Sequence, residues 1–266
     1  MSVESVDLII PLADNPSKFE DWELRYCLRS FAKYGRGLGR VVIVSDNIRG
    51  WTREVVWGSR ADERKDCKDA NIIAKVLYGL CFVDTRKVAW CCDDCALLRP
   101  VNLAEMPIIY NDRGEEWFKA LPAEKRTKWQ RRMLRTFGEI RKLRDELGCK
   151  ATRWECNYDS HTLQVFWANE LSDALEDAMD RTGGDVCINT WAGLWAGFDG
   201  IVGAEQNSVK VTMEGGKGMT CFDGKVFLGY NDAGWMGGAR AELEKRFPEP
   251  CRFEADGEGW AGGPIE

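Results

Sequence analysis

A strand–helix–strand pattern near the N-terminus most restricts the folds that this chain can adopt. Residues 6–11 read V-D-L-I-I-P and residues 40–46 read R-V-V-I-V-S-D, two short apolar runs that are typical of buried strands. Between them, residues 20–34 place apolar side chains at helical spacing. Two strands joined by a helix indicate the start of a parallel α/β sheet.

The remaining chain extends this pattern. It predicts further helices at 69–80, 163–181 and 238–247, and further strands at 88–92, 208–213 and 225–230. The length of 266 residues suits one large domain. We therefore predict an α/β fold with a Rossmann-like, mostly parallel sheet flanked by helices. It forms a single domain over residues 1–254, and a flexible, Gly-rich tail follows at 255–266.

Three of the predicted strands end in polar loops, at residues 11–15, 45–47 and 93–94. In an open α/β sheet, ligands bind outside the carboxyl ends of the strands. The sequence therefore predicts one cleft that these three loops line. The glycines at 35, 37 and 39 are not a dinucleotide fingerprint, because they precede a strand and have the wrong spacing.

Composition excludes several classes of protein. Hydrophobic residues make up 44% of the chain and charged residues 30%, which is atypical of disorder, collagen or a coiled coil. No apolar run approaches the ~18 residues of a membrane span. The N-terminus lacks the basic start of a signal peptide, so we expect a cytoplasmic protein with reduced thiols. Its 11 Cys then serve mainly as small buried residues, and its single histidine excludes a multi-His zinc site.

Residues 113–153 differ in charge from the rest of the chain. They hold 13 Lys or Arg against 6 acids, a net charge of +7, so the remainder of the −6 chain carries −13. Helical spacing of their apolar residues predicts one or two basic helices inserted in the domain. Such a segment is either a solvated helical face or a surface that contacts phosphates or nucleic acid. Arg131, Arg132 and Arg135 are its candidate acceptor-binding residues.

Paired polar residues after two strands are candidates for a metal site. Asp93 and Asp94 follow a strongly apolar strand, and adjacent carboxylates there are costly unless they are solvated or bind a cation. Hard oxygen ligands suit Mg²⁺ or Mn²⁺, whose remaining ligands are commonly substrate phosphates. Asn231 and Asp232 repeat the arrangement after a later strand, although an Asn-Asp-Ala-Gly turn also explains them.

Other residues are candidates for phosphate binding and proton transfer. Arg25 and Arg29 lie four residues apart on the first helix. They either bind a pyrophosphate bidentately or form i,i+4 charge pairs on the helix surface. His161 lies among polar neighbours, so it can serve as a base or a metal ligand as well as a structural hydrogen-bonding group.

Several segments resemble the conserved blocks of the Stealth proteins. F-E-D-W-E-L-R-Y-C-L-R-S-F-A-K-Y with the later V-V-I-V-S-D resembles the second block, and C-D-D-C-A-L-L-R-P-V resembles its Asp-Asp and Arg-Pro continuation. Y-D-S-H-T is similar to the third block, K-V-F-L-G-Y-N-D to the fourth, and F-P-E-P-C-R-F-E to the closing segment. The matches follow the family order from about residue 6 to 254.

The resemblance implies a sugar-phosphate transferase related to GT-A glycosyltransferases, with a nucleotide-sugar donor, such as a UDP-sugar, and a divalent Mn²⁺ or Mg²⁺. Asp93, Asp94 and Asp232 would hold the metal, and His161 and Asp232 would be catalytic. Donor-binding residues would be Arg25, Arg29, Asp46, Lys75 and Asn231. The chain departs from the family in its reduced first block and in having Cys92 in place of Asn. Simple sugar transfer is therefore as well supported as sugar-phosphate transfer.

Three hypotheses about function follow. The first is a GT-A-type glycosyltransferase; the chain also looks like bacteriophage glycosyltransferases that decorate modified bases, so the basic segment makes DNA a candidate acceptor. The second is Stealth-like hexose-1-phosphate transfer to a glycan with the same residues. The third is a non-catalytic module that binds nucleic acid through residues 113–153.

Overall fold

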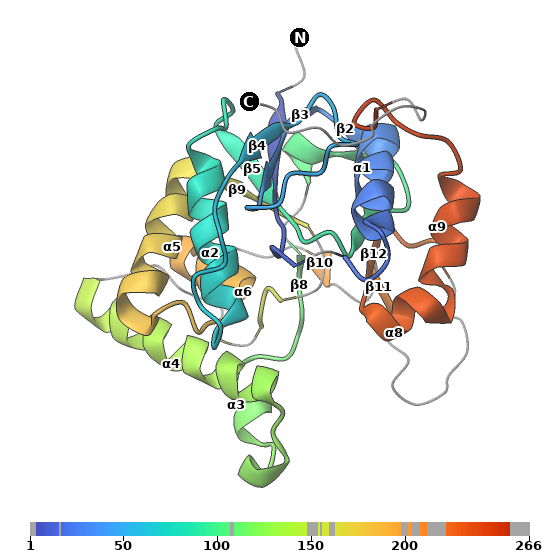
Figure 1. Cartoon of the computed structure of the whole chain (residues 1–266). Coiled ribbons are helices and arrows are strands. Elements are labelled where there is room, and N and C mark those ends of the chain that lie inside the picture. Colours follow the sequence, from blue (N-terminus) through green and yellow to red (C-terminus); the bar gives the residue numbers. More distant parts are fainter. Residues whose placement is uncertain are drawn as a thin grey trace.

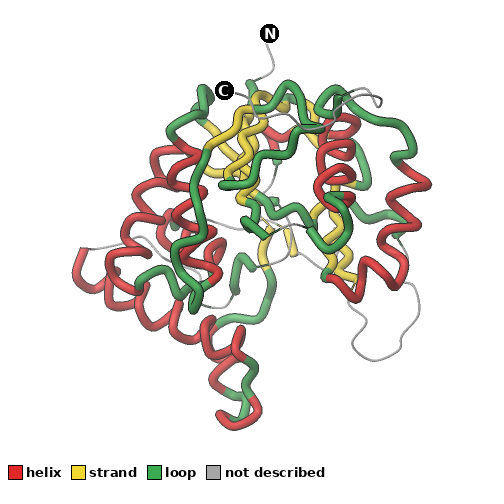
Figure 2. Tube along the Cα trace, in the orientation of Figure 1, coloured by secondary structure: helices red, strands yellow, loops and turns green. Residues whose placement is uncertain are grey.

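A five-stranded sheet forms the centre of the computed structural model (Figures 1 and 2). The model describes residues 4–15, 17–106, 109–147, 154, 156–159, 163–197, 202–203, 208–211 and 222–255. The strand order is β4-β3-β1-β5-β9, in which the first four strands are parallel and β9 is antiparallel to β5. The strands are β1 (Val6–Pro11), β3 (Leu38–Val44), β4 (Val56–Gly58), β5 (Lys87–Trp90) and β9 (Gln164–Trp167). The mostly parallel α/β sheet predicted from the sequence is confirmed.

Helices cover both faces of this sheet because its central strands are apolar on both sides. On one face, Ile9 packs in a hydrophobic cluster with side chains of α2 (Lys68–Leu80), α4 (Lys128–Leu147), α5 (Ala168–Thr182) and α6 (Ile188–Ala196). On the other face, the neighbouring Leu8 and Ile10 pack with Leu24, Leu28 and Phe31 of α1 (Trp22–Tyr34). Figure 1 shows α2, α4, α5 and α6 on one side of the sheet and α1 on the other. Alternation along β1 therefore supplies both cores of a three-layer structure.

A second, three-stranded sheet continues directly from the first. Its order is β11-β12-β6, with β6 (Cys95–Leu97), β11 (Ser208–Val211) and β12 (Phe227–Tyr230). Four residues, 91–94, separate the end of β5 from the start of β6 and link the two sheets. β12 leads into α8 (Asp232–Gly234), a π-helical turn η3 (Trp235–Ala239) and α9 (Arg240–Arg246). The link with Asp93 and Asp94 and the end of β12 thus lie side by side.

The remaining elements are short. Two small parallel pairs join β2 (Gly35–Arg36) to β7 (Val101–Asn102) and β8 (Ile109–Tyr110) to β10 (Val202–Gly203). Single turns of 3-10 helix occur at η1 (Leu103–Glu105) and η2 (Ala123–Lys125). Within the described part of the chain, no helix combines the length and the apolar character needed to cross a membrane.

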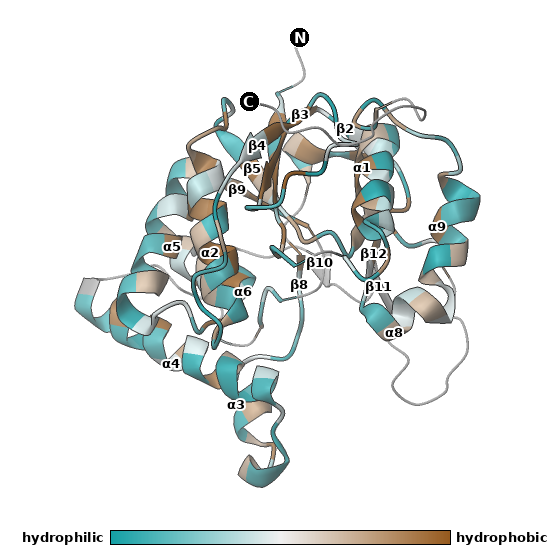
Figure 3. Cartoon of the chain, viewed as in Figure 1, coloured by the Kyte–Doolittle hydropathy of each residue, from teal (hydrophilic) through white to brown (hydrophobic). Residues whose placement is uncertain are grey.

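The basic segment forms α3 (Glu115–Lys119) and the long helix α4, which agrees with the prediction of one or two helices. One face of α4 is part of the main core, because Met133, Phe137, Ile140 and Leu143 are completely buried there. The opposite face carries charged side chains, which give α4 its mixed colouring in Figure 3. The segment is therefore amphipathic and shares the core of the central sheet.

One sequence prediction about an element was wrong. The helix predicted at 163–181 is strand β9 followed by α5. β9 has only four residues, Q-V-F-W, and its alternating burial is too short to separate from the helical pattern that follows. Pairing with β5 decides its conformation, so the signal for it is non-local.

Candidate functional site

A cleft with a volume of about 780 Å³ opens at the carboxyl ends of β1 and β5. Its walls carry two sets of charged side chains. The acids are Asp14, Asp21, Glu23, Asp62, Asp93, Asp94 and Asp232, and the bases are Lys18, Arg49, Arg64, Lys65, Lys68 and Lys75. This place agrees with the cleft predicted at the strand ends, because the loops at 11–15 and 93–94 line it. The loop at 45–47, which was predicted to line the same cleft, does not.

The link between the two sheets positions the Asp93–Asp94 pair. The Tyr230 backbone N–H donates to the Asp94 carbonyl at 3.2 Å, and the Tyr230 hydroxyl donates to the Asp93 carbonyl at 3.3 Å. The backbone of the pair is thereby fixed to the end of β12, and both residues line the cleft. Burial raises the pKa of Asp93 above its usual value, and Lys68 and Arg49 partly oppose this effect.

Glu23 and Asp232 add further negative charge to the same wall of the cleft. Burial raises the pKa of Glu23 to about 8, and repulsion from Asp93, Asp94 and Asp232 contributes to the rise. Asp232 is exposed and pairs with Lys18, whose Nζ lies 2.6 Å from its carboxylate. Four acids therefore share one electrostatic neighbourhood. Glu23 was not among the sequence candidates, since a lone acid in the first turn of a helix is usually a surface residue.

The start of α2 forms the basic wall of the cleft. Lys65 and Lys68 line the cleft beside Asn71, and the N-cap residue Cys67 makes no side-chain hydrogen bond to the helix end. The Asn71 side chain accepts from the Arg64 N–H at 2.8 Å and donates to the Arg64 carbonyl at 2.7 Å. The turn before the helix is therefore fixed. Cys92, Asp94 and Asp93 raise the pKa of Lys68, which lines the same cleft as the two aspartates.

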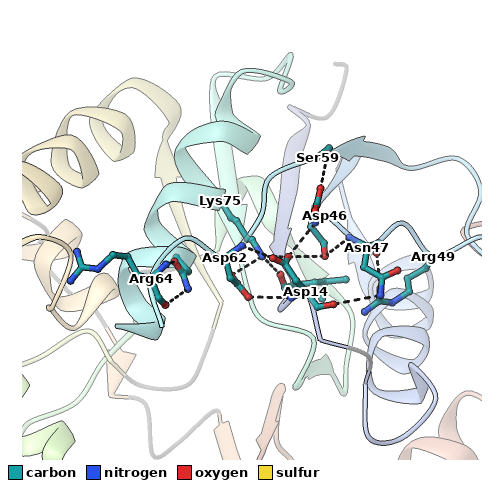
Figure 4. Close-up of polar contacts among 11 residues, drawn as sticks. Asp14, Asp46, Asn47, Arg49, Ser59, Asp62, Arg64 and Lys75 are labelled. Carbon is teal, nitrogen blue, oxygen red and sulfur yellow. Dashed lines mark hydrogen bonds and ion pairs between the residues drawn. The ribbon is translucent and has the colours of Figure 1, made fainter. Parts of the chain in front are cut away.

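Lys75 organises the floor of the cleft (Figure 4). The side chain is almost fully buried, and its Nζ lies 2.6 Å from the Leu12 carbonyl, 2.7 Å from Asp14 Oδ1 and 2.8 Å from Asp62 Oδ1. Asp14 also accepts hydrogen bonds from the backbone N–H groups of Asp62 and Asp46. Burial would raise the pKa of Asp14, but these hydrogen bonds, led by that of Lys75, lower it. The hub joins the loops after β1, β3 and β4.

Asp46 lies at the edge of this hub and is exposed. Its backbone N–H donates to Asp14 at 3.2 Å, and its carboxylate accepts from the Ser59 hydroxyl at 2.9 Å. Asp46 and Lys75, two predicted donor-binding residues, are thus brought together through Asp14. The sequence pointed to the loop at 11–15 but gave no reason to select Asp14 within that loop. It also gave no reason to select Asp62, which lies in a later loop.

Arg25 and Arg29 lie outside the cleft lining and hold the C-terminal segment. Arg29 is buried, and its Nε and Nη2 donate to the Glu254 carboxylate at 2.6 and 2.9 Å. Arg25 Nη1 donates to the same carboxylate at 3.0 Å. Arg29 Nη1 also donates to the Phe247 carbonyl at 2.9 Å. These contacts give both arginines a structural role, so their assignment as donor-binding residues gains no support from their placement.

The arginines predicted to bind an acceptor are engaged within the chain. Arg132 pairs with Asp69 at 2.6 Å and with Asp185 at 2.9 Å, which ties α4 to α2 and to the turn before α6. Arg135 also pairs with Asp185, and Arg131 donates to the Arg126 carbonyl. Arg131 and Arg135 remain exposed on the outer face of α4. The charges of Arg132 and Arg135 are therefore compensated by acids within the chain.

The remaining candidates have mixed placements. Asn231 accepts from the Gly234 N–H at 2.8 Å, which is the capping contact of the turn that the sequence offered as its alternative role. His161 lies outside the described residues. The described cysteines are all free thiols, and burial raises the pKa of Cys92 and Cys95 well above the usual value. Five described cysteines are buried, as expected of small apolar residues, whereas Cys81 is exposed. The buried ones are Cys27, Cys67, Cys91, Cys156 and Cys187.

Within the described ranges, no three His, Cys, Asp or Glu side chains form a ready-made metal site. The chain matches no protein-family model and no curated protein. The Stealth resemblance therefore stays a prediction.

Proposed function

We propose that the chain is a metal-dependent glycosyltransferase that moves a sugar from a nucleotide-sugar, such as a UDP-sugar, to an acceptor. The observation that carries the proposal is the cleft at the strand ends, in which the acidic wall of Asp93 and Asp94 faces the basic start of α2. Binding of a diphosphate requires both basic and acidic side chains. Lysines bind its oxygens directly, and carboxylates hold the cation that neutralises its charge.

The donor set of the acidic wall fits Mg²⁺ or Mn²⁺. Its ligands are hard carboxylate oxygens, and mutual repulsion among Glu23, Asp93, Asp94 and Asp232 favours a bound cation. In the usual magnesium site one or two carboxylates and substrate phosphates share the ion, and Asp93 and Asp94 offer two carboxylates in the cleft. Asp93 and Asp94 would hold the metal, which would supply charge neutralisation for the leaving diphosphate.

Other residues of the cleft would bind the phosphates, position the nucleoside and contact the acceptor. Lys65 and Lys68, at an uncapped helix start, attract the phosphates and hold them there. The Lys75 hub fixes the loops at 11–15 and 45–47, against which the nucleoside would lie. Their rigidity reduces the entropy lost when the donor is ordered for transfer. Asp232, exposed at the rim of the cleft, is available to an incoming acceptor hydroxyl once its contact with Lys18 opens.

The test is nucleotide release from a panel of UDP-sugars with Mn²⁺, using oligosaccharides and duplex DNA with hydroxymethylated bases as acceptors. We expect UDP as the product, whereas UMP would indicate sugar-phosphate transfer. Because Asp94 would be a metal ligand, Asp94→Asn should lower kcat/KM by about 100-fold or more. Asp112→Asn, at an exposed acid outside the cleft, is the matched control and should retain activity.

Two results would contradict the proposal. One is the absence of nucleotide release with every donor and acceptor pair. The other is full activity of the Asp94→Asn variant, which would remove the metal site from the mechanism.

A further inference from the structure

A second, smaller pocket adjoins the cleft. Its volume is about 220 Å³, and it shares Ile72, Cys92 and Asp94 with the lining of the cleft. Sites for drug-sized ligands have volumes of about 300–1,000 Å³, so this pocket suits one small group. It lies beyond Asp94, next to the place where the donor diphosphate would be held.

The lining of this pocket combines aromatic and polar side chains. Trp90, at the end of β5, and Trp129, on α4, supply indole rings. The Trp129 Nε1–H donates to Asp159 at 2.7 Å, which fixes that ring and carboxylate in the wall. Asn189, in the first turn of α6, adds an amide. Aromatic rings with a few fixed polar groups are typical of sites that orient a small polar ligand.

Two polar atoms of the pocket residues have no partner. Trp90 Nε1 is a buried donor and Asn189 Oδ1 is a buried acceptor, and neither makes a hydrogen bond with any described residue. The Trp90 side chain is only 8% exposed. An unpaired buried donor or acceptor is costly, so native proteins rarely retain one without a reason. Here the donor and the acceptor belong to two residues that line the same small pocket.

We propose that this pocket binds a sugar ring, with Trp90 donating a hydrogen bond to one hydroxyl and Asn189 accepting one from another. A hydroxyl group is both donor and acceptor, and a sugar ring presents several of them beside apolar C–H surfaces that pack on indole rings. The inference deepens the proposed function, on which it rests for the identity of the ligand. It assigns the sugar to residues that neither the resemblance nor the sequence patterns selected.

The test measures binding of free D-glucose, D-galactose and N-acetyl-D-glucosamine by saturation-transfer NMR. Trp90→Phe keeps the ring and removes the N–H, and Asn189→Leu keeps the shape and removes the acceptor. Each substitution should weaken binding of the preferred sugar about tenfold. Each should leave the melting temperature unchanged or higher, because it removes an unpaired buried atom. A residue that served only to stabilise the fold would show the opposite combination.

Trp235→Phe is the matched control. Trp235 also has an unpaired, buried Nε1, but it lies in a separate hydrophobic cluster with Tyr26 and Tyr230. Its substitution should leave sugar affinity unchanged. Because Trp90 also packs in the core, Asn189→Leu gives an independent result if Trp90→Phe fails to fold.

Calorimetry with UDP and with the UDP-sugar then identifies the source of the ring. If the pocket holds the donor sugar, Asn189→Leu weakens binding of the UDP-sugar and leaves UDP binding unchanged. If it holds an acceptor sugar, only binding of the free sugar weakens. The proposal is overturned if no free sugar or UDP-sugar binds more weakly to either variant than to Trp235→Phe. Nucleotide release plays no part in these measurements, so failure of the transferase proposal remains distinguishable.

Discussion

Lys75 is a buried cation whose ammonium group has three oxygen partners, two of them carboxylates. Lys75→Met should cost about 3 kcal/mol or more of unfolding free energy, because it leaves Asp14 and Asp62 facing each other without a cation. Urea unfolding followed by circular dichroism measures the change. Lys245→Met, at an exposed position on α9, is the control and should change stability by less than about 0.5 kcal/mol. Equal midpoints for the two variants would refute the role of the hub.

At the residue scale, the sequence predicted which loops form the cleft better than it predicted the roles of single side chains. The strand ends located the cleft, and Asp93 and Asp94 line it. Arg25 and Arg29 have the spacing of a phosphate grip, yet their partner Glu254 is more than 200 residues away along the chain. Ion pairs of such long range depend on the tertiary structure. A sequence pattern alone cannot separate a buried clamp from a ligand-binding pair.

The clamp between α1 and the C-terminal segment is an element-scale feature with a defined pH dependence. Burial would raise the pKa of Glu254, but its hydrogen bonds with Arg29 lower it below the usual 4.5. A carboxylate whose pKa is lowered by folding stabilises the folded state above its unfolded pKa. This contribution is lost as the pH falls through the folded-state pKa.

Glu254→Gln should therefore lower the unfolding free energy by about 3 kcal/mol at pH 7, since Arg29 stays buried without its counterion. The difference from the wild-type chain should shrink as the pH falls below about 4.5. Thermal unfolding at a series of pH values tests both statements. Glu249→Gln, an exposed acid in the same segment, should show no such dependence. A destabilisation that stayed constant down to pH 3 would show that the ion pair is not its cause.

Elements with strong local patterns were predictable, and those that depend on partners were not. The first strand was predicted at 6–11 and β1 spans Val6–Pro11; the predicted helix at 69–80 corresponds to α2, Lys68–Leu80. The first is a continuous apolar run and the second has helical apolar spacing, and each of these local patterns indicates its conformation. β9 was missed because it is short and antiparallel, and because its pairing with β5 supplies the energy that its sequence lacks. The Asp-Asp pair was located through its strand, not through its own sequence.

At the scale of the whole molecule, the basic segment and the sheet share one core. Phe137 of α4 is completely buried in the cluster that contains Ile9 of β1 and Val88 of β5. Residues 113–153 differ from the rest of the chain in net charge, but their apolar side chains pack in the same hydrophobic core. The +7 segment and the −13 remainder are joined by ion pairs such as Arg132 with Asp69. Folding of the segment and of the cleft should therefore be cooperative.

Phe137→Ala tests this unity, because it opens a cavity in the shared core. It should lower the unfolding free energy by about 3–5 kcal/mol and shift the whole transition, with far-UV and near-UV circular dichroism reporting the same midpoint. Lys142→Ala, on the solvent face of the same helix, should cost less than about 0.5 kcal/mol. Deletion of residues 113–153 should leave a chain without a cooperative transition, since the sheet loses one wall of its core. A deletion variant that folds and still binds a nucleotide-sugar would instead establish the segment as a separable addition, and its arginines would regain their place as an acceptor surface.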